Sequence, residues 1–315
     1  MANPSKMRFW VTLLLTLILP LKGLLPIEGE LEGGLEGVCA LYAQVPPMLK
    51  TAWHQRSPYN DLCPKGKLAG CVAIAMAQVM NYHQYPLHGI GKSSYFWTDS
   101  KTNRRTKLSA DYAGTYYRWE DMDGAPISAA QLVYHCGVSV WMDYSDSFSG
   151  SNEYYAKSAL VDYFGYSSDI KLAARNKYSD EEWAALLKSN LDKGWPIIYS
   201  SGGHTFVVDG YNEQGLFHTN QGFGSVSPKC TYTLESLGSK SSSTALVNIH
   251  PDPSSQTWPT SPAWLVYLND GSLSQYPYTE SDFLLFQEDN LLIGTGEELY
   301  AEPLDNVSYF KAITH

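Results

Sequence analysis

The pattern of hydrophobic and polar positions predicts helices along the first half of the chain. An almost uninterrupted apolar run over 71–82 predicts a helix that is buried on every side, and Pro86 follows its end. The stretches 128–138 and 152–164 also have helical patterns. A helix over 180–191 has the clearest boundary, because Ser179 and Glu182 are spaced as a capping box at its start.

The pattern changes to short strand-like runs after this last helix. The segments "WPIIYSS", "HTFVVDGYN", "GLFHTNQG", "KCTYTLESL" and "TALVNIHP" are rich in β-branched and aromatic residues and are separated by glycine and asparagine. Helices followed by strands favour an α+β fold over a regular alternation of the two.

The end of the chain has a different character. A Pro/Ser-rich linker over 251–262 is followed by segments with hairpin-like turns at Asn269-Asp270-Gly271 and Asp289-Asn290. We therefore predict a main domain over 41–250 and a small β-module over 263–315, after an N-terminal portion over 1–40.

The N-terminal portion has the layout of a secretory signal followed by a short acidic stub. Lys6 and Arg8 precede an apolar stretch that ends near Leu19. Pro20 and Lys22 interrupt this stretch, so a stable membrane span of roughly 20 residues is not expected. Small residues allow cleavage after Ala40, with Ala43 as an alternative. This layout predicts an exported protein, either secreted or held at the cell surface.

Charge and cysteine content exclude several classes of function. The formal net charge is −10, and lysine and arginine form no basic cluster, so a nucleic-acid groove is not expected. The chain has 5 cysteines and no CxxC pair, which argues against a zinc site and against a disulfide scaffold. We predict no metal and no cofactor. Cys63 and Cys136 lie beside apolar residues and are expected to be buried thiols.

Cys71 is placed where a thiol becomes a nucleophile. It follows Gly70 at the start of the buried helix, where unpaired N–H groups and the helix dipole favour a thiolate. A base is then required, and His204 stands out because it follows two glycines at the start of a strand, 133 residues after Cys71. Each feature by itself is compatible with a structural role. Together they predict nucleophilic cysteine chemistry.

The third member of such a site orients the histidine. Asn220 lies on the next strand-like segment, which we expect to pair with the strand of His204. Asp209 is the alternative, but it lies five residues along the same strand as His204. That separation is roughly 16–17 Å in an extended strand. We therefore reject Asp209.

These motifs resemble the streptopain family of secreted bacterial cysteine peptidases, a papain-like group. The resemblance covers about 45–249 and rests on "WHQRSPYN", "GCVAIAMAQVMNYHQYP", "CGVSVWMDYS", "SGGHTFVVDGY" and "HTNQGFG". It implies a papain-like peptidase domain over 41–250, with a helical half that carries the cysteine and a β half that carries the histidine and asparagine. The final module resembles small β-domains at the ends of many exported Bacteroidetes proteins, which implies sorting or attachment.

The resemblance also implies roles for individual residues. Cys71 is the expected nucleophile, His204 the general base and acid, Asn220 the orienting residue and Gln55 a donor in the oxyanion hole. The expected lining of the substrate cleft is Ser149, Ser151, Gly203 and Gln221. The resemblance also implies that the substrate has an apolar side chain two residues before the scissile bond.

The chain departs from the family pattern at two places. Gln221 stands where the family has a tryptophan after the orienting asparagine, so the histidine is expected to be more solvated unless Phe223 covers it. The family's best-known members also carry a folded inhibitory propeptide of about a hundred residues, whereas the peptidase motifs here follow the short acidic stub almost directly.

Taken together, the sequence predicts a secreted, monomeric cysteine endopeptidase that hydrolyses polypeptides through an acyl-enzyme on Cys71. One alternative is a related papain-like acyl transferase or a peptidoglycan peptidase. Another is a catalytically inactive binding protein at the cell surface.

Overall fold

A computed structural model describes residues 43–124, 126–225, 229–252, 254, 263–268, 273–277, 283–287, 289–295 and 298–313. The predicted signal and acidic stub, most of the predicted linker and the predicted turn at 269–271 lie outside the described residues. No helix among the described residues combines the length and the apolar character that crossing a membrane requires.

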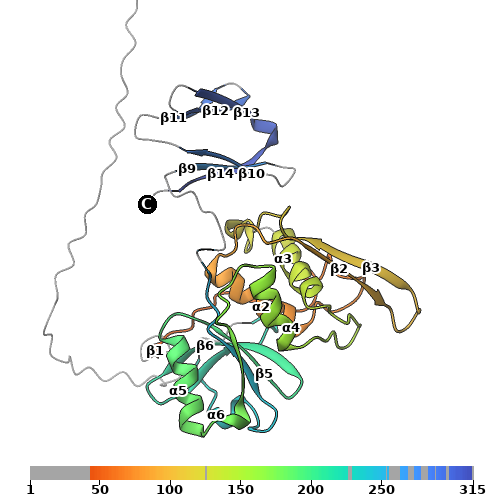
Figure 1. The fold of residues 1–315 in the computed structure, drawn as a ribbon, viewed down its shortest axis with the longest axis vertical. Helices are drawn as coiled ribbons and strands as arrows, with labels where there is room; N and C mark the ends of the chain where they lie inside the picture. The colour runs from red at the N-terminus through yellow and green to blue at the C-terminus, as the bar shows by residue number, and fades with distance from the viewer. Residues whose placement is uncertain are drawn as a thin grey trace, which may run out of the picture. The chain divides into compact units, whose positions relative to one another are not determined.

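Among the described residues of the first two-thirds of the chain, four longer helices lie close to their predicted positions (Figure 1). Their bounds are α2 Cys71–His83, α3 Pro126–Ser139, α4 Glu153–Asp162 and α5 Asp180–Leu191. The capping box of α5 is confirmed. The Ser179 side chain accepts from the Glu182 N–H, and the Glu182 side chain accepts from the Ser179 N–H.

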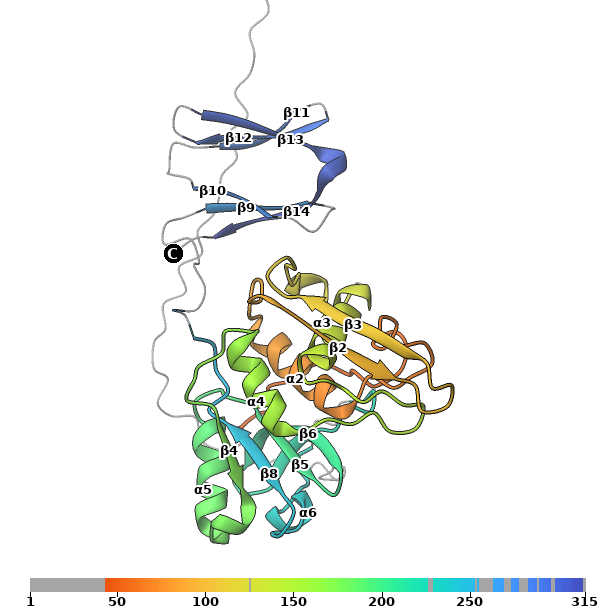
Figure 2. The same cartoon turned by 45° about the vertical axis from the view of Figure 1, so that its right-hand side comes forward.

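A six-stranded antiparallel sheet combines β1, near the start of the described residues, with five strands from the later segment 171–247 (Figure 2). Its strand order is β1-β6-β5-β8-β4, and β7 pairs with β6. The strands are β1 Ala43–Val45, β4 Lys171–Ala174, β5 Ile197–Ser201, β6 His204–Asn212, β7 Phe217–Asn220 and β8 Thr244–Val247. The predicted pairing of the His204 and Asn220 segments is confirmed by the β6–β7 ladder.

Successive side chains of the sheet point to opposite faces, and both faces are buried. Ile198 and Val207 belong to the hydrophobic core that also contains α2, α3 and α4. Ile197 and Val208 belong to a second core, formed against α5. The sheet therefore lies between α2 and α5, and this arrangement packs α2, which begins at Cys71, against β6, which begins at His204.

Two parts of the main domain differ from the sequence-based expectation. The segment 229–237 was predicted as a strand, but this is wrong for its second half, because Thr233 caps the short helix α6 Leu234–Leu237. The hairpin of β2 Lys92–Thr98 and β3 Arg105–Asp111 was not predicted. Short 3-10 helices at Trp119–Asp121 and Arg175–Lys177 complete the domain.

The described residues between 263 and 313 contain two three-stranded antiparallel sheets, ordered β10-β9-β14 and β11-β12-β13. Their strands are β9 Ala263–Leu268, β10 Leu273–Pro277, β11 Phe283–Gln287, β12 Asn290–Thr295, β13 Glu298–Pro303 and β14 Val307–Ile313, with a 3-10 helix at Leu304–Asn306. Val266 and Ile293 share one small core, so the two sheets pack together.

Candidate active site

Cys71 is the first residue of α2, and its thiol is free and almost buried, with 7% of the residue exposed. Gly70 precedes it with φ 94°, a conformation that favours glycine. A Cβ on Gly70 would lie 2.5 Å from the Met142 side chain and 3.3 Å from the Ser149 carbonyl oxygen. Glycine therefore lets the 142–149 segment pack directly against the start of the helix.

His204 begins β6, immediately after the turn made by Gly202 and Gly203. Its Nε2 lies 3.0 Å from the backbone oxygen of Gln221. A carbonyl oxygen only accepts, so Nε2 carries the proton of the neutral ring and Nδ1 is left as the basic nitrogen. Burial lowers the pKa of His204 below its usual value, and the hydrogen bond to Gln221 partly opposes this shift.

Phe223 covers the imidazole of His204. The two rings are stacked, with centroids 4.7 Å apart and an interplanar angle of 17°. The Phe206 ring is also stacked with His204, at 6.0 Å. The Gln221 side chain forms a hydrogen bond to a neighbouring residue instead, because its Nε2 donates to Thr219 Oγ1 at 2.9 Å. The aromatic cover that the family pattern places at position 221 is therefore supplied by Phe223.

Asn220 is 1% exposed, and its side-chain amide forms hydrogen bonds with backbone atoms rather than with the imidazole of His204. Its Nδ2 donates to the Thr51 carbonyl oxygen at 2.7 Å, and its Oδ1 accepts from the Gly222 N–H at 3.1 Å. These bonds fix the segment on which the Gln221 carbonyl meets His204. The Asn220 side chain therefore bonds Thr51 and Gly222, and the hydrogen bond to His204 is made by the backbone carbonyl of the next residue, Gln221.

Thr51 and Gln78 extend this support, and the sequence analysis did not identify them. Thr51 Oγ1 donates to Gln78 Oε1 at 2.8 Å, and both residues are buried. Gln78 is an amide in an otherwise apolar helical run, which is a sequence signal for a buried polar partner. Its partner Thr51 could not be identified from sequence, because the contact joins two separate segments.

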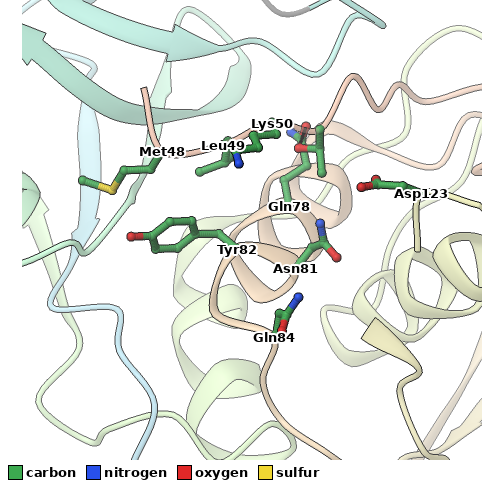
Figure 3. A pocket seen from close by; sticks show the side chains of 9 residues that line it. Met48, Leu49, Lys50, Gln78, Asn81, Tyr82, Gln84 and Asp123 are labelled. Carbon is green, nitrogen blue, oxygen red and sulfur yellow. Dashed lines mark hydrogen bonds between the residues drawn. The ribbon is translucent and has the colours of Figure 1, made fainter. Parts of the chain in front are cut away.

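A cavity of about 320 Å³ lies beside this pair (Figure 3). Side chains from α2 and its C-terminal end, from the 48–51 segment and from Asp123 line it. Gln78 Nε2 has no hydrogen-bond partner among the described residues. The cavity thus lies next to the amide that supports Thr51.

Gln55 belongs to a segment that joins the start of α2 to the loop after β7. Its carbonyl accepts from the Ala69 N–H at 3.0 Å, and the preceding His54 forms an isolated β-bridge with Phe223. The Gln55 side chain is half-buried and lines a cavity of about 430 Å³ together with Leu68, Gly222 and Phe223. No described residue hydrogen-bonds its side-chain amide, so this amide is available to a ligand.

The expected cleft residues occupy different environments. Ser149 is 2% exposed, and its hydroxyl donates to the Leu68 carbonyl at 2.7 Å. The Ser151 hydroxyl donates to the Val140 carbonyl at 2.6 Å. Both hydroxyls therefore hold the loop beside Gly70 in place, and they are already engaged. Gly203 faces open space, since a Cβ added to it would meet no described atom within 4 Å.

The Asp209 carboxylate is bonded to residues other than His204. Its Oδ1 lies 2.5 Å from His218 Nδ1, and both residues are 0% exposed. Its Oδ2 accepts from the Leu49 N–H at 2.8 Å. Asp209, on β6, therefore connects the segment around Leu49 with β7 through these two hydrogen bonds.

The other free thiols of the described residues are unsuited to nucleophilic attack. Burial raises the pKa of Cys63 to about 12, and it raises the pKa of Cys136 further. Cys230 is disulfide-bonded. Within the described residues, no group of three or more His, Cys, Asp or Glu side chains is placed to hold a metal ion.

Comparisons with known proteins show similarity to one family model and to several cysteine proteases. A model of the peptidase C10 family matches residues 53–228. Streptopain from Streptococcus pyogenes is 28% identical over 204 residues, which cover 56% of this chain and 51% of the relative. The thiol protease/hemagglutinin PrtT from Porphyromonas gingivalis is 30% identical over 213 residues, covering 59% of this chain and 24% of the relative. The matched region thus spans about half of streptopain and a quarter of PrtT.

Two solved structures share the fold. Active interpain A, a cysteine protease of Prevotella intermedia, is 33% identical with a TM-score of 0.58, covering 68% of this chain and 98% of that chain. A fragment of prointerpain A from the same organism is 33% identical with a TM-score of 0.60, covering 66% of this chain and 73% of that chain. The expected papain-like α+β architecture is confirmed.

Proposed function

Since this chain belongs to the peptidase C10 family, a family of cysteine peptidases, we propose that it hydrolyses polypeptides through an acyl-enzyme on Cys71. The observation that carries the proposal is the placement of a free thiol at the start of α2, packed against the strand that begins at His204. The ring of His204 has its proton fixed on Nε2 by the Gln221 carbonyl, so Nδ1 is the atom that accepts the thiol proton.

The reaction follows from these assignments. His204 Nδ1 takes the proton of Cys71, and the thiolate attacks the carbonyl carbon of the scissile peptide bond. The C–N bond then breaks, and the imidazolium returns a proton to the leaving amine. Water, deprotonated by His204, hydrolyses the thioester and restores the thiol. Stabilisation of the imidazolium by the Gln221 carbonyl lowers the barrier of the first step.

Gln55 is the proposed side-chain donor to the tetrahedral oxyanion, together with the Cys71 N–H. The first N–H groups of a helix have no intrahelical acceptor, so the Cys71 N–H is available. The segment of Gln55 is bonded to Ala69, two residues before Cys71, and its side-chain amide has no partner among the described residues. A preorganised donor of this kind contributes about 2.7–4 kcal/mol to transition-state stabilisation.

The proposed substrate is a polypeptide with an apolar side chain two residues before the scissile bond. The loop of Ser149 and Ser151 and the turn of Gly203 border the reacting groups on the proposed substrate path. Because both serine hydroxyls are engaged within the protein, we assign substrate recognition there to backbone and to apolar contacts. The Gly203 turn leaves room for the substrate backbone.

We also propose that the protein is exported, since the basic and apolar layout of its first residues is that of a secretory signal. The proposed roles of the C-terminal module in sorting or attachment rest on resemblance to exported proteins. We further propose that the protein acts as a monomer.

The test combines hydrolysis with thiol labelling. Cys71→Ala should abolish casein hydrolysis and prevent alkylation at neutral pH, whereas Cys63→Ala and Cys136→Ala should keep both. Intact Cys71 that is neither alkylated nor active would favour the inactive binding protein. Labelling without cleavage of any polypeptide, but with transfer to an amine or cleavage of a peptidoglycan stem peptide, would favour the alternative acyl chemistry.

A further inference from the structure

Trp141 occupies a backbone position that normally belongs to glycine. After α3 ends at Ser139, the Trp141 N–H donates to the Val138 carbonyl at 3.2 Å and the Met142 N–H donates to the Gly137 carbonyl at 3.0 Å. This is the hydrogen-bond pattern of a Schellman motif, and its left-handed residue is usually glycine. Trp141 takes that place with φ 51°. A bulky side chain in this conformation is a genuine outlier.

Burial does not explain the presence of this tryptophan, because it is 55% exposed. Its ring packs on Tyr155, with centroids 5.3 Å apart, and Tyr155 in turn contacts Tyr154 at 6.3 Å. Tyr154 is 64% exposed and Tyr155 is 38% exposed. We call Trp141, Tyr154 and Tyr155 the aromatic platform. It presents large, stiff rings to solvent at a cost in backbone strain, which indicates a binding role.

Residues next to the aromatic platform in sequence contact residues next to Cys71 and His204. Met142, the residue after Trp141, packs against Gly70, which precedes Cys71. Glu153, the residue before Tyr154, accepts a hydrogen bond from Thr205 at 3.0 Å, and Thr205 follows His204. The neighbours of the platform residues therefore touch the flanks of both reacting groups.

The Ser149–Ser151 loop connects the two parts of the platform. The Ser151 hydroxyl bonds the Val140 carbonyl, directly before Trp141, and Asn152 caps the helix that carries the two tyrosines. This loop is proposed to border the substrate residue two positions before the scissile bond. An extended peptide advances about 3.3 Å per residue. The next residues upstream therefore come within reach of the platform.

We propose that the aromatic platform is an extended subsite that binds a large apolar or aromatic side chain of the polypeptide substrate, three or four residues before the scissile bond. This inference rests on the proposed peptidase function and adds to it a second specificity-determining position. Tryptophan and tyrosine suit this role because they offer a large contact area and lose little side-chain freedom on binding. Aromatic stacking with the substrate side chain adds to the burial of apolar surface.

The test uses two peptides that are identical except at the third and fourth residues before the scissile bond, where one has phenylalanine and leucine and the other has serine. The unmodified protein should hydrolyse the apolar peptide with at least tenfold higher kcat/KM. Trp141→Gly should reduce this preference to about twofold without lowering the Tm, because glycine is favoured at the left-handed position. Phe96→Ser, which removes another exposed aromatic side chain, should keep the full preference.

A binding measurement separates this inference from the proposed chemistry. In the Cys71→Ala background, Trp141→Gly should weaken binding of the apolar peptide about tenfold and leave binding of the serine peptide within twofold. Should the unmodified protein hydrolyse no peptide at all, the proposed function fails while these affinities still decide the role of the platform. An equal preference for the apolar peptide in the parent and in Trp141→Gly would overturn the subsite, whether or not the Tm of the variant is lowered. Tyr154→Ser repeats the test without altering the strained position.

Discussion

The ring of Phe223 lies nearly parallel to the imidazole of His204, with centroids 4.7 Å apart and planes inclined by 17°. Phe223 is 64% exposed, so it shields the histidine while remaining in contact with solvent itself. A hydrogen bond in a drier environment is stronger. The stacking therefore protects the bond between His204 and the Gln221 carbonyl.

Removing this cover should weaken catalysis. Phe223→Ala is expected to lower kcat/KM by about tenfold, or roughly 1.4 kcal/mol, because water then reaches the imidazole. Gln221→Trp should give little gain in the natural protein, where Phe223 already covers the ring, but should recover much of the loss in the Phe223→Ala background. Steady-state kinetics on one peptide across the four combinations measures this coupling. Equal effects of Gln221→Trp in both backgrounds would contradict the shielding role.

The buried amide of Asn220 should matter more than the side chain of Gln221. Asn220→Ala leaves the Thr51 carbonyl and the Gly222 N–H without their partners, at an expected cost of about 1–3 kcal/mol in the free energy of unfolding. Its kcat/KM should also fall, because the segment that carries the Gln221 carbonyl is released. Gln221→Ala keeps that carbonyl and should cost far less in both measurements.

Thr51→Val provides the matched control for this network, since it removes only the hydroxyl that bonds Gln78 and keeps the carbonyl that Asn220 bonds. Its kinetic defect should be smaller than that of Asn220→Ala. The pH dependence of kcat/KM should move for Asn220→Ala and stay in place for Thr51→Val. A larger kinetic loss in Gln221→Ala than in Asn220→Ala would refute the indirect role of the asparagine.

Stability should fall on mild acidification because of His135. Burial lowers the pKa of His135 to about 4, although the nearby Asp111 opposes this shift. The unfolded chain binds a proton near pH 6.5, whereas the folded protein does so only near pH 4. The stabilising contribution is thus present above pH 6.5 and is lost as the pH falls towards 4, by up to about 3 kcal/mol.

Urea unfolding at pH 7.5, 5.5 and 4.5 measures this loss. His135→Gln should reduce the slope between the last two pH values relative to the natural protein. Some slope should remain, because burial also lowers the pKa of His83 to about 4. A slope unchanged by His135→Gln would show that other groups control the acid sensitivity.

Asp209 should be required for folding and not for proton transfer. Asp209→Ala removes the acceptor of the Leu49 N–H and the carboxylate beside His218, all within a buried site. The free energy of unfolding should fall by about 3 kcal/mol or more. Kinetics at low temperature, corrected for the folded fraction, should retain the pH profile of the natural protein. A shifted profile would mean that Asp209 influences His204 after all.

The point of truncation should determine whether the C-terminal module can be removed without damage. The Tyr85 hydroxyl donates to the Asp252 carbonyl at 2.9 Å, and the Asp252 N–H donates to Gly165 at 3.2 Å. A chain that ends after Ser254 keeps these bonds and should retain kcat/KM on a small peptide within a few-fold. A chain that ends after His250 should have a lower Tm. Loss of activity in the longer, folded truncation would assign the module a part in the cleft.

The sequence predicted the elements with strong local signals and missed those without them. The helix over 180–191 was predicted within its observed bounds because a capping box and an apolar face agree. In β2, exposure alternates along the strand, but Tyr95, Phe96 and Trp97 are three consecutive aromatic residues, so the sequence has no apolar–polar alternation to detect. In the 229–237 segment, strand-forming residues concealed the helix cap at Thr233.

The candidate site shows the same division. Cys71 and His204 could be proposed from the sequence because each lies beside glycine at the start of a regular element. The hydrogen bond from His204 goes to a backbone carbonyl, which every residue type carries, so no sequence signal indicates it. The contact of Thr51 with Asn220 depends on the tertiary arrangement of distant segments.

The left-handed backbone of Trp141 has a consequence for laboratory evolution of this protein. Glycine at this position should increase stability by about 1 kcal/mol, since it relieves an unfavourable conformation. A screen that rewards only heat resistance would therefore enrich Trp141→Gly early. If the ring binds substrate, such a screen would broaden the range of polypeptides cleaved while it improved thermostability, and only a counter-selection on sequence preference would retain the tryptophan.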